Sequence, residues 1–181
     1  MIFVTVGTDH HPFDRLIQAV DALAEKGGAG EEVFVQTGSS TVSPRFCASQ
    51  PFLPFDDLMA RIEQASMIIC HGGPGSIMPA VYLKKVPVVW PREKKYREVV
   101  DDHQLDFSAR LADKGLILRV TSADELKTAV LDYDRLVSSL IPVSEGMEGK
   151  TPRARVTAFS QELENLCQRL ITWRENGHDA K

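Results

Sequence analysis

Short apolar runs alternate with amphipathic segments along most of this chain, and this alternation restricts the fold more than any other feature of the sequence. Successive parallel strands need a crossover between them, and helices supply it, so the alternation predicts an α/β fold: a parallel sheet with helices on both faces. We expect strands at residues 2–6, 33–36, 67–70, 86–90 and 116–120, and helices at 12–26, 56–65, 74–84, 100–114 and 122–133.

Composition limits the size and class of the protein. The 181 residues, 43% of them hydrophobic, suffice for one domain with a real core, and the net charge of −4 argues against nucleic acid as a partner. Three cysteines at wide spacings (Cys47, Cys70 and Cys167) form no disulfide framework, which favours a reducing cytoplasm. We expect neither a leader peptide nor a membrane span, because no apolar run is long enough.

The chain is expected to divide into a domain at residues 1–141, a linker at 142–152 and an amphipathic helix at 153–175. The linker is marked by the segment PVSEGMEGKTP. The last helix either docks on its own domain or reaches a partner chain. A homodimer of the isolated protein is a further alternative. Its apolar positions recur at spacings of three and four: Val156, Phe159, Leu163, Leu166, Leu170 and Trp173.

The sharpest local signal is MIICHGGPGS at residues 67–76, in which an expected buried strand runs into two glycines and a proline. Pro74 suits the first position of a helix, whose free N–H groups and dipole favour an anion such as a diphosphate. Ser76 would add a hydroxyl and His71 a further donor. A tight turn without a ligand uses the same residues, so the pattern alone leaves both interpretations open. The spacing matches neither a dinucleotide fingerprint nor a Walker loop.

The loop after the first expected strand carries Thr8, Asp9, His10 and His11, where donors and a titratable base would face a ligand. Neighbouring histidines suggest a metal. Adjacent positions rarely ligate one ion, however, and the other histidines show no metal-ligand spacing. We therefore expect no metal site and no cofactor.

Three further segments admit both a functional and a structural interpretation. Asp101 to Gln104 would hydrogen-bond a sugar or simply cap a helix. The basic residues between Lys84 and Arg97, which include Arg92, form a solvated face, or they contact an anionic lipid headgroup or an acceptor diphosphate. Asp132 to Asp134 is expected to be a solvated helix end, with Leu126, Val130 and Leu131 directed inward before it.

Four motifs in this order, VTVGT, PFDDLM, HGGPGS and VDDHQ, resemble the C-terminal, donor-binding half of GT-B glycosyltransferases of family 28. The resemblance covers about residues 1–135. It implies a Rossmann-like domain equivalent to one half of a GT-B fold. The chain is most similar to free-standing small subunits of two-chain transferases, which act in dolichol-linked oligosaccharide synthesis and in bacterial exopolysaccharide and capsule synthesis.

The resemblance also implies roles for individual residues. The nucleotide base would lie near Phe55, and Thr8 would face the cleft. His103 and Gln104 match positions that hydrogen-bond the donor sugar. Pro79 stands where relatives carry a glutamate that holds the ribose hydroxyls. The diphosphate would be bound by the turn residues His71, Gly72, Gly73, Pro74, Gly75 and Ser76.

Family precedent implies an inverting, metal-independent transfer from a nucleoside-diphosphate sugar, with uridine as the expected base. The catalytic base would lie on a separate membrane-anchored chain that also binds a polyprenyl-linked acceptor; His10 and Asp9 are the local candidates. The protein would then be cytoplasmic and peripheral at the inner face of the membrane. Two alternatives stay open: an epimerase-like enzyme, and a non-catalytic nucleotide-binding module.

Overall fold

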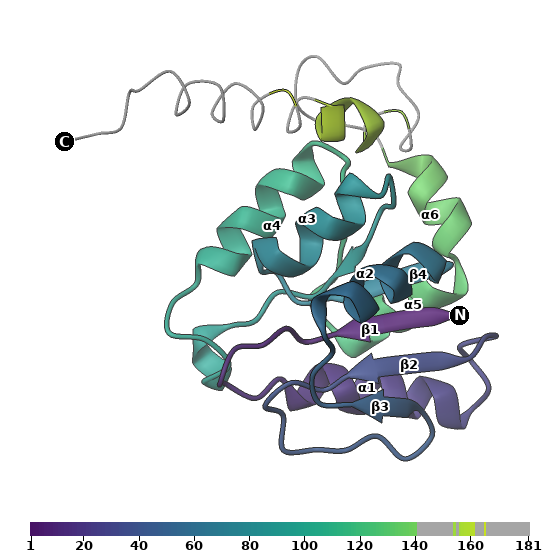
Figure 1. Ribbon diagram of the computed structural model, residues 1–181, viewed down its shortest axis with the longest axis vertical. Helices are drawn as coiled ribbons and strands as arrows, with labels where there is room; N and C mark the ends of the chain where they lie inside the picture. Colours follow the sequence, from purple (N-terminus) through teal and green to yellow (C-terminus); the bar gives the residue numbers. More distant parts are fainter. Residues whose placement is uncertain (141–153, 155, 162–164, 166–181) are drawn as a thin grey trace.

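The computed structural model describes residues 1–140, 154, 156–161 and 165, and its centre is a parallel sheet of six strands. The strand order is β3-β2-β1-β4-β5-β6, which is the Rossmann order and confirms the predicted α/β class (Figure 1). The strands are β1 (Ile2–Thr5), β2 (Val33–Gln36), β3 (Ala48–Gln50), β4 (Met67–Cys70), β5 (Val88–Val89) and β6 (Leu118–Arg119).

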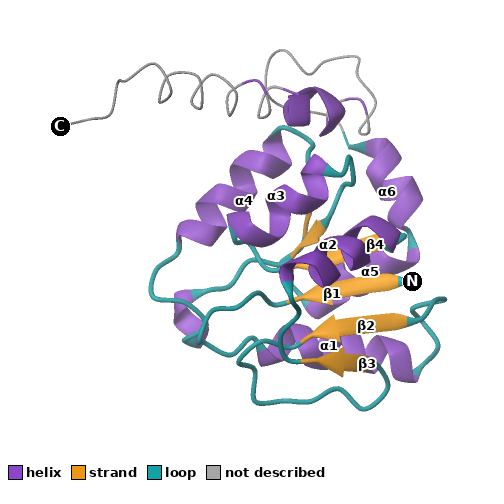
Figure 2. Ribbon diagram, viewed as in Figure 1, coloured by secondary structure: helices purple, strands orange, loops and turns teal. Residues whose placement is uncertain are grey.

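Helices cover both faces of the sheet, as Figure 2 shows for α2 in front of it and α1 behind it. Helices α1 and α5 share one face, and α2, α3 and α4 share the other. The helices are α1 (Asp14–Glu25), α2 (Phe55–Gln64), α3 (Pro74–Tyr82), α4 (His103–Asp113), α5 (Ala123–Leu131) and α6 (Tyr133–Ser139), with a 3-10 turn at Lys94–Tyr96.

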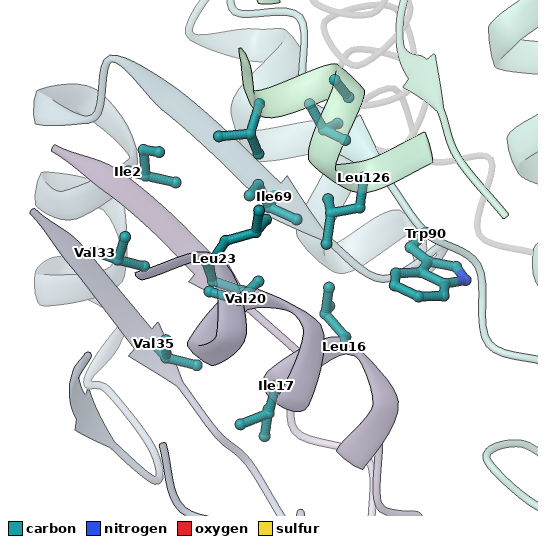
Figure 3. Close-up of a cluster of buried hydrophobic side chains, with 14 of the residues drawn as sticks. Ile2, Leu16, Ile17, Val20, Leu23, Val33, Val35, Ile69, Trp90 and Leu126 are labelled. Carbon is teal, nitrogen blue, oxygen red and sulfur yellow. The ribbon is translucent and has the colours of Figure 1, made fainter. Parts of the chain in front are cut away.

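The core explains why the central strands are apolar without alternation. Ile2 and Val4 of β1 pack against α1 and α5, as Figure 3 shows for Ile2, Leu23 and Leu126. Phe3, between them in the sequence, points to the opposite face and packs with α2 and α3. Both faces of a parallel sheet are covered, so both sets of side chains are buried.

Two elements were not predicted. The edge strand β3 has the polar sequence ASQ and is exposed, so no apolar run marks it. Helix α6 follows α5 after a break at Asp132, and because α5 ends at Leu131 that side chain is 58% exposed rather than directed inward.

Several predicted boundaries were wrong by a few residues. Helix α1 begins at Asp14 rather than Pro12, and α4 at His103 rather than Val100; β5 and β6 keep only two residues each. Helix α2 begins at Phe55, one residue before the predicted start at Asp56; its N-cap is Pro54, and no side chain caps it. Ser122, the first residue of the predicted fifth helix, is the N-cap of α5, and its Oγ accepts a hydrogen bond from the Glu125 N–H at 3.2 Å.

The described part of the C-terminal segment packs on its own domain. Val156 is fully buried in the cluster formed by α3 and α4, and Phe159 packs against it. The Ser160 hydroxyl donates to the Val81 carbonyl at 2.6 Å. The predicted linker at 142–152 and the seam positions from Leu163 onward lie outside the described residues. Among the helices that are described, none has the length and hydropathy needed to cross a bilayer.

Candidate functional site

The loops that follow β1 and β4 meet at the point where the strand order reverses. β1 and β4 are paired, with Thr5 opposite Cys70, and the His71 N–H donates to the Thr5 carbonyl at 3.3 Å. The other neighbour of β1 in the sheet is β2, and the other neighbour of β4 is β5. The connections that follow β1 and β4 therefore lead to opposite sides of the sheet. In open parallel sheets this crevice is where ligands bind.

Helix α3 begins in this crevice, and no side chain of the described residues caps its N-terminus with a hydrogen bond. Gly73 is the N-cap and Pro74 the first helical residue, as predicted. Pro74 and Gly75 are exposed, and a Cβ at Gly75 would meet no atom within 4 Å. Pro74 has no N–H, and the N–H groups of Ser76 and Ile77 donate to the Gly73 carbonyl at 3.1 and 3.2 Å. This end of α3 therefore presents the Gly75 N–H and a positive dipole to a ligand.

His71 is buried beneath the turn, between two glycines. A Cβ on Gly7 would lie 2.5 Å from Cε1 of His71, and one on Gly73 would lie still closer to Nε2. Gly7 also has a φ of +80°, which L side chains rarely adopt. The imidazole therefore occupies the space that side chains at residues 7 and 73 would need. It packs between the loop after β1 and the turn after β4.

The same burial keeps His71 neutral. Burial first, and then the positive charge of Arg92, lower the pKa of His71 from 6.5 to about 4. Its Nδ1 is buried without a hydrogen-bond partner among the described residues. The predicted donor is thus an uncharged imidazole, which can offer a single N–H to an anion.

Arg92 lies directly beneath the crevice and is 1% exposed. Its guanidinium donates to three backbone carbonyls: Val6 at 2.7 Å, His11 at 2.7 Å and Glu98 at 2.8 Å. These bonds join the loop after β1 to the segment before α4. The assignment of Arg92 to a solvated basic face was therefore wrong; of that basic run, Lys84, Lys94, Lys95 and Arg97 are exposed.

Glu98, which is buried, and Arg15, whose side chain is 20% exposed, complete an ion network with Arg92. We call Arg15, Arg92 and Glu98 the buried ion network. Arg15 Nε lies 2.6 Å from Glu98 Oε1, and Arg15 Nη2 lies 2.9 Å from Oε2, a bidentate pair. The Arg15 guanidinium also packs over the rings of Phe13 and Trp90. Charges this buried are stable only because each has close partners.

A pocket of about 420 Å³ opens between the glycine turn and the start of α4. Gln104 forms one wall: its Cβ is packed against Gly72, and its Oε1 accepts the Arg92 N–H at 3.1 Å. His103 stands at the mouth, highly exposed, with Nδ1 2.6 Å from Asp101 Oδ1. The lining residues are Gly72, Pro74, His103, Gln104, Asp106, Phe107 and Arg110.

Not every residue predicted for the site lies in this pocket. Thr8 is exposed on the loop after β1, and Phe55, the first residue of α2, is 69% exposed; neither lines the pocket. Ser76 lies in the first turn of α3 and is 8% exposed. Pro79 lies inside α3, where it has no N–H to donate.

The loop after β1 brings Asp9, His10 and His11 together. One potential metal-ligand atom from each residue lies within 4.8 Å of the other two. This grouping was not expected from the sequence, because adjacent histidines rarely bind one metal ion. Burial of Asp9 raises the pKa of its carboxyl, but hydrogen bonds from His11 and the charge of Arg92 outweigh this and lower the pKa overall. The carboxylate is therefore ionised at neutral pH.

The ends of the helices near Asp101 and Asp132 have structural roles. Asp101 Oδ1 accepts the N–H of His103, the first residue of α4, at 3.1 Å. Asp102 is the N-cap residue but makes no side-chain cap, and its carboxylate accepts the Lys94 N–H instead. Asp132 pairs with Arg135, and the Tyr133 hydroxyl donates to the Val86 carbonyl. The segment 132–134 is thus a junction between α5 and α6 rather than only a solvated end.

The family model of the glycosyltransferase family 28 C-terminal domain matches residues 1–155. The chain belongs to this family. The UDP-N-acetylglucosamine transferase subunit ALG13 of Homo sapiens is 31% identical over 129 residues, which are 66% of this chain and 11% of the human protein. The subunit of the same name from Yarrowia lipolytica is 28% identical over 95 residues, 51% of this chain and 46% of that protein. The chain thus spans about a tenth and under half of these two relatives.

Solved glycosyltransferases share the fold of this family 28 domain. The calicheamicin glycosyltransferase CalG4 has a TM-score of 0.59 at 13% identity, over 98% of this chain and 43% of that one. The glycotransferase of kitacinnamycin has a TM-score of 0.57 at 16% identity, over 90% of this chain and 38% of that one. The chain matches less than half of each, which agrees with the prediction that it is one half of a GT-B fold.

Sequence reasoning missed the buried ion network of this family 28 domain. Arg92 directly follows the buried strand segment VPVVWP, at the carboxyl end where ligands bind, and that position was the available signal. Arg15 and Glu98 are 83 residues apart, and no spacing in the sequence connects them.

Proposed function

We propose that this chain is the donor-binding subunit of a two-chain inverting glycosyltransferase. It binds a nucleoside-diphosphate sugar, with uridine diphosphate as the expected leaving group. Membership of family 28 supports the reaction class, and the two relatives named above are subunits of a UDP-N-acetylglucosamine transferase. UDP-N-acetylglucosamine is therefore the first donor to test.

One observation carries the proposal: the uncapped start of α3, open to solvent in the crevice beside the buried His71. The leaving diphosphate gains negative charge in the transition state. The Gly75 N–H and the dipole of α3, already held in place, would stabilise that charge without reorganising. The transfer is accordingly proposed to need no metal ion.

The acceptor hydroxyl must lose a proton to a base, which we assign to a separate membrane-anchored subunit. That subunit would also hold a polyprenyl-diphosphate-linked saccharide, and would keep this chain at the cytoplasmic face of the membrane. Asp9 and His10 are exposed on the loop after β1 and do not line the pocket beside the turn, so we place the base on the partner. The product would be an intermediate of polysaccharide or glycoprotein glycan synthesis.

Gly75 offers a sharp test of the diphosphate position. A side chain at this residue meets open space, so both Gly75→Ala and Gly75→Asp are expected to fold. The aspartate would place a carboxylate at the N-terminus of α3 and compete with the diphosphate. By calorimetry with uridine diphosphate, we expect Gly75→Asp to bind at least about tenfold more weakly than Gly75→Ala. Equal affinity in the two variants would remove the start of α3 from the site.

The two-chain assignment is tested by turnover. The purified chain should bind uridine diphosphate but transfer no sugar from UDP-N-acetylglucosamine. Activity should appear when membranes that carry a partner subunit and a lipid-linked acceptor are added. Transfer by the isolated chain would show that the base lies in this chain and that the two-chain assignment is wrong.

A further inference from the structure

The loop after β1 carries a compact group of metal-ligating side chains outside the pocket. His11 Nδ1 lies 2.6 Å from Asp9 Oδ1, and His10 Nδ1 lies 3.7 Å from the same oxygen. The two imidazole rings are 4.0 Å apart between centroids. Three potential ligand atoms, two nitrogens and one oxygen, therefore surround one small volume.

We propose that Asp9, His10 and His11 form a binding site for one transition-metal dication of the zinc class. Ligands around tetrahedral zinc are about 3.3 Å apart, given bond lengths of about 2.0–2.1 Å. The observed separations of 2.6 and 3.7 Å lie on either side of that value, so shifts of well under 1 Å would complete the site. The metal would replace the proton shared by Asp9 and His11.

The backbone of this loop is already held in place. Asp9 Oδ1 accepts the His11 N–H at 2.8 Å, which closes a tight turn between the two ligands. The His11 carbonyl accepts from the buried Arg92 guanidinium at 2.7 Å. Because Asp9 and His11 are positioned before the metal arrives, binding does not have to order the loop.

The donor set selects the class of ion. Two imidazoles and one carboxylate suit zinc, copper or nickel, whereas Mg²⁺ and Ca²⁺ prefer sites built from oxygen. The guanidinium of Arg92 lies 3.9 Å from Asp9 Oδ1 and opposes any cation there, so ions held mainly by charge are disfavoured further. Three protein ligands leave a fourth position for water or an anion oxygen.

The chain contains a natural control for this site. Asp101 and His103 repeat the Asp-x-His arrangement, with the same 2.6 Å contact and a backbone hydrogen bond of 3.1 Å. No second imidazole is adjacent, because residue 102 is an aspartate. If an Asp-x-His pair alone held the metal, both loops would bind; the proposal requires His10 as well.

Calorimetric titration of the untagged, EDTA-treated full chain with ZnCl₂ near neutral pH tests the proposal without any nucleotide. We expect one high-affinity zinc per chain, weakened at least about tenfold in His10→Ala and in His11→Ala. His103→Ala should keep the wild-type affinity, and MgCl₂ should give no binding at this site. Substituting Co²⁺ should give visible absorption bands that His11→Ala removes.

His10 is 84% exposed, so His10→Ala is expected to fold, and its circular dichroism spectrum checks this. The proposal is overturned if wild-type chain binds zinc no more tightly than the His10→Ala/His11→Ala double variant, or if His103→Ala weakens binding as much as His11→Ala does. Because no nucleotide is present, this result is separate from success or failure of the uridine diphosphate experiments.

Discussion

The carboxyl end of the sheet contains two kinds of polar residue that differ in how they are held. In the buried ion network each charged group has a close partner, and the members come from the start of α1 and from the loop between β5 and α4. The exposed rim, which we define as Thr8, His10 and His103, faces solvent at the ends of the same loops. The network holds the loop after β1 and the loop before α4 in place. The rim side chains are not needed for this, so they can contact a ligand.

The largest effect is expected from the network itself. Arg92→Met would leave three backbone carbonyls without their donor, two of them in buried hydrogen bonds, and would uncouple the loop after β1 from the segment before α4. We expect the free energy of unfolding in urea to fall by about 3–5 kcal/mol. Arg135→Met, which removes an exposed ion pair to Asp132, is the control and should cost under about 1 kcal/mol. Similar losses in the two variants would contradict a fixing role for Arg92.

The glycines that enclose His71 should come next. Gly73→Ala places a Cβ against the imidazole, and we expect a loss of about 1–3 kcal/mol in urea denaturation. Gly7→Ala should cost more, because its φ of +80° adds backbone strain to the same clash.

Two variants check the cause of that loss. Gly75→Ala, at an unobstructed position, should not destabilise the protein. His71→Ala combined with Gly73→Ala should cost less than the sum of the two single substitutions, because the clash disappears with the ring. Strict additivity would show that the imidazole is not what Gly73 accommodates.

A pH titration should separate the buried histidine from those of the rim. His71 has a pKa of about 4 when folded and an ordinary value near 6.5 when unfolded, so the unfolded state binds more protons between these values. Stability should therefore fall as the pH falls, by about 2 kcal/mol between pH 7 and pH 5 from this group alone. Arg92 and Asp9 are the charged groups that act on it.

The control for the titration is His71→Gln, which should flatten the dependence of the unfolding free energy on pH over that interval. A slope that survives in His71→Gln would assign the dependence to another group.

The smallest effect on stability is expected at the rim. Thr8→Ala and His103→Ala remove exposed side chains and should change the free energy of unfolding by under about 0.5 kcal/mol. If the rim is a binding surface, their effect should appear in the affinity for UDP-N-acetylglucosamine instead. A loss of stability comparable to that of Arg92→Met would show that the rim helps to hold the fold.

Elements with a strong local pattern were predictable. The strands β1, β2 and β4 and the start of α3 at Pro74 lie where apolar runs, glycine and proline placed them. The edge strand β3 and helix α6 were missed because neither has an apolar period of its own: β3 is stabilised by pairing with β2, and α6 by packing against the cores on both faces.

The candidate site divides in the same way. The glycine turn and its position after a central strand follow from local residue types, since only small residues and a proline suit a buried strand that runs straight into a helix. The proximity of Gln104 to Gly72 and of His71 to Gly7 depends on strands that pair across long stretches of chain.

By itself the sequence determined the class of fold, the order of its strong elements and the turn that opens α3, because these depend on side-chain periodicity and on the backbone preferences of glycine and proline. The tertiary structure alone decided which charges are buried. Arg15, Arg92 and Glu98 look like ordinary surface residues in a charged sequence. They become a network only when the fold brings the start of α1 against the loop between β5 and α4 and removes most of the water from between them.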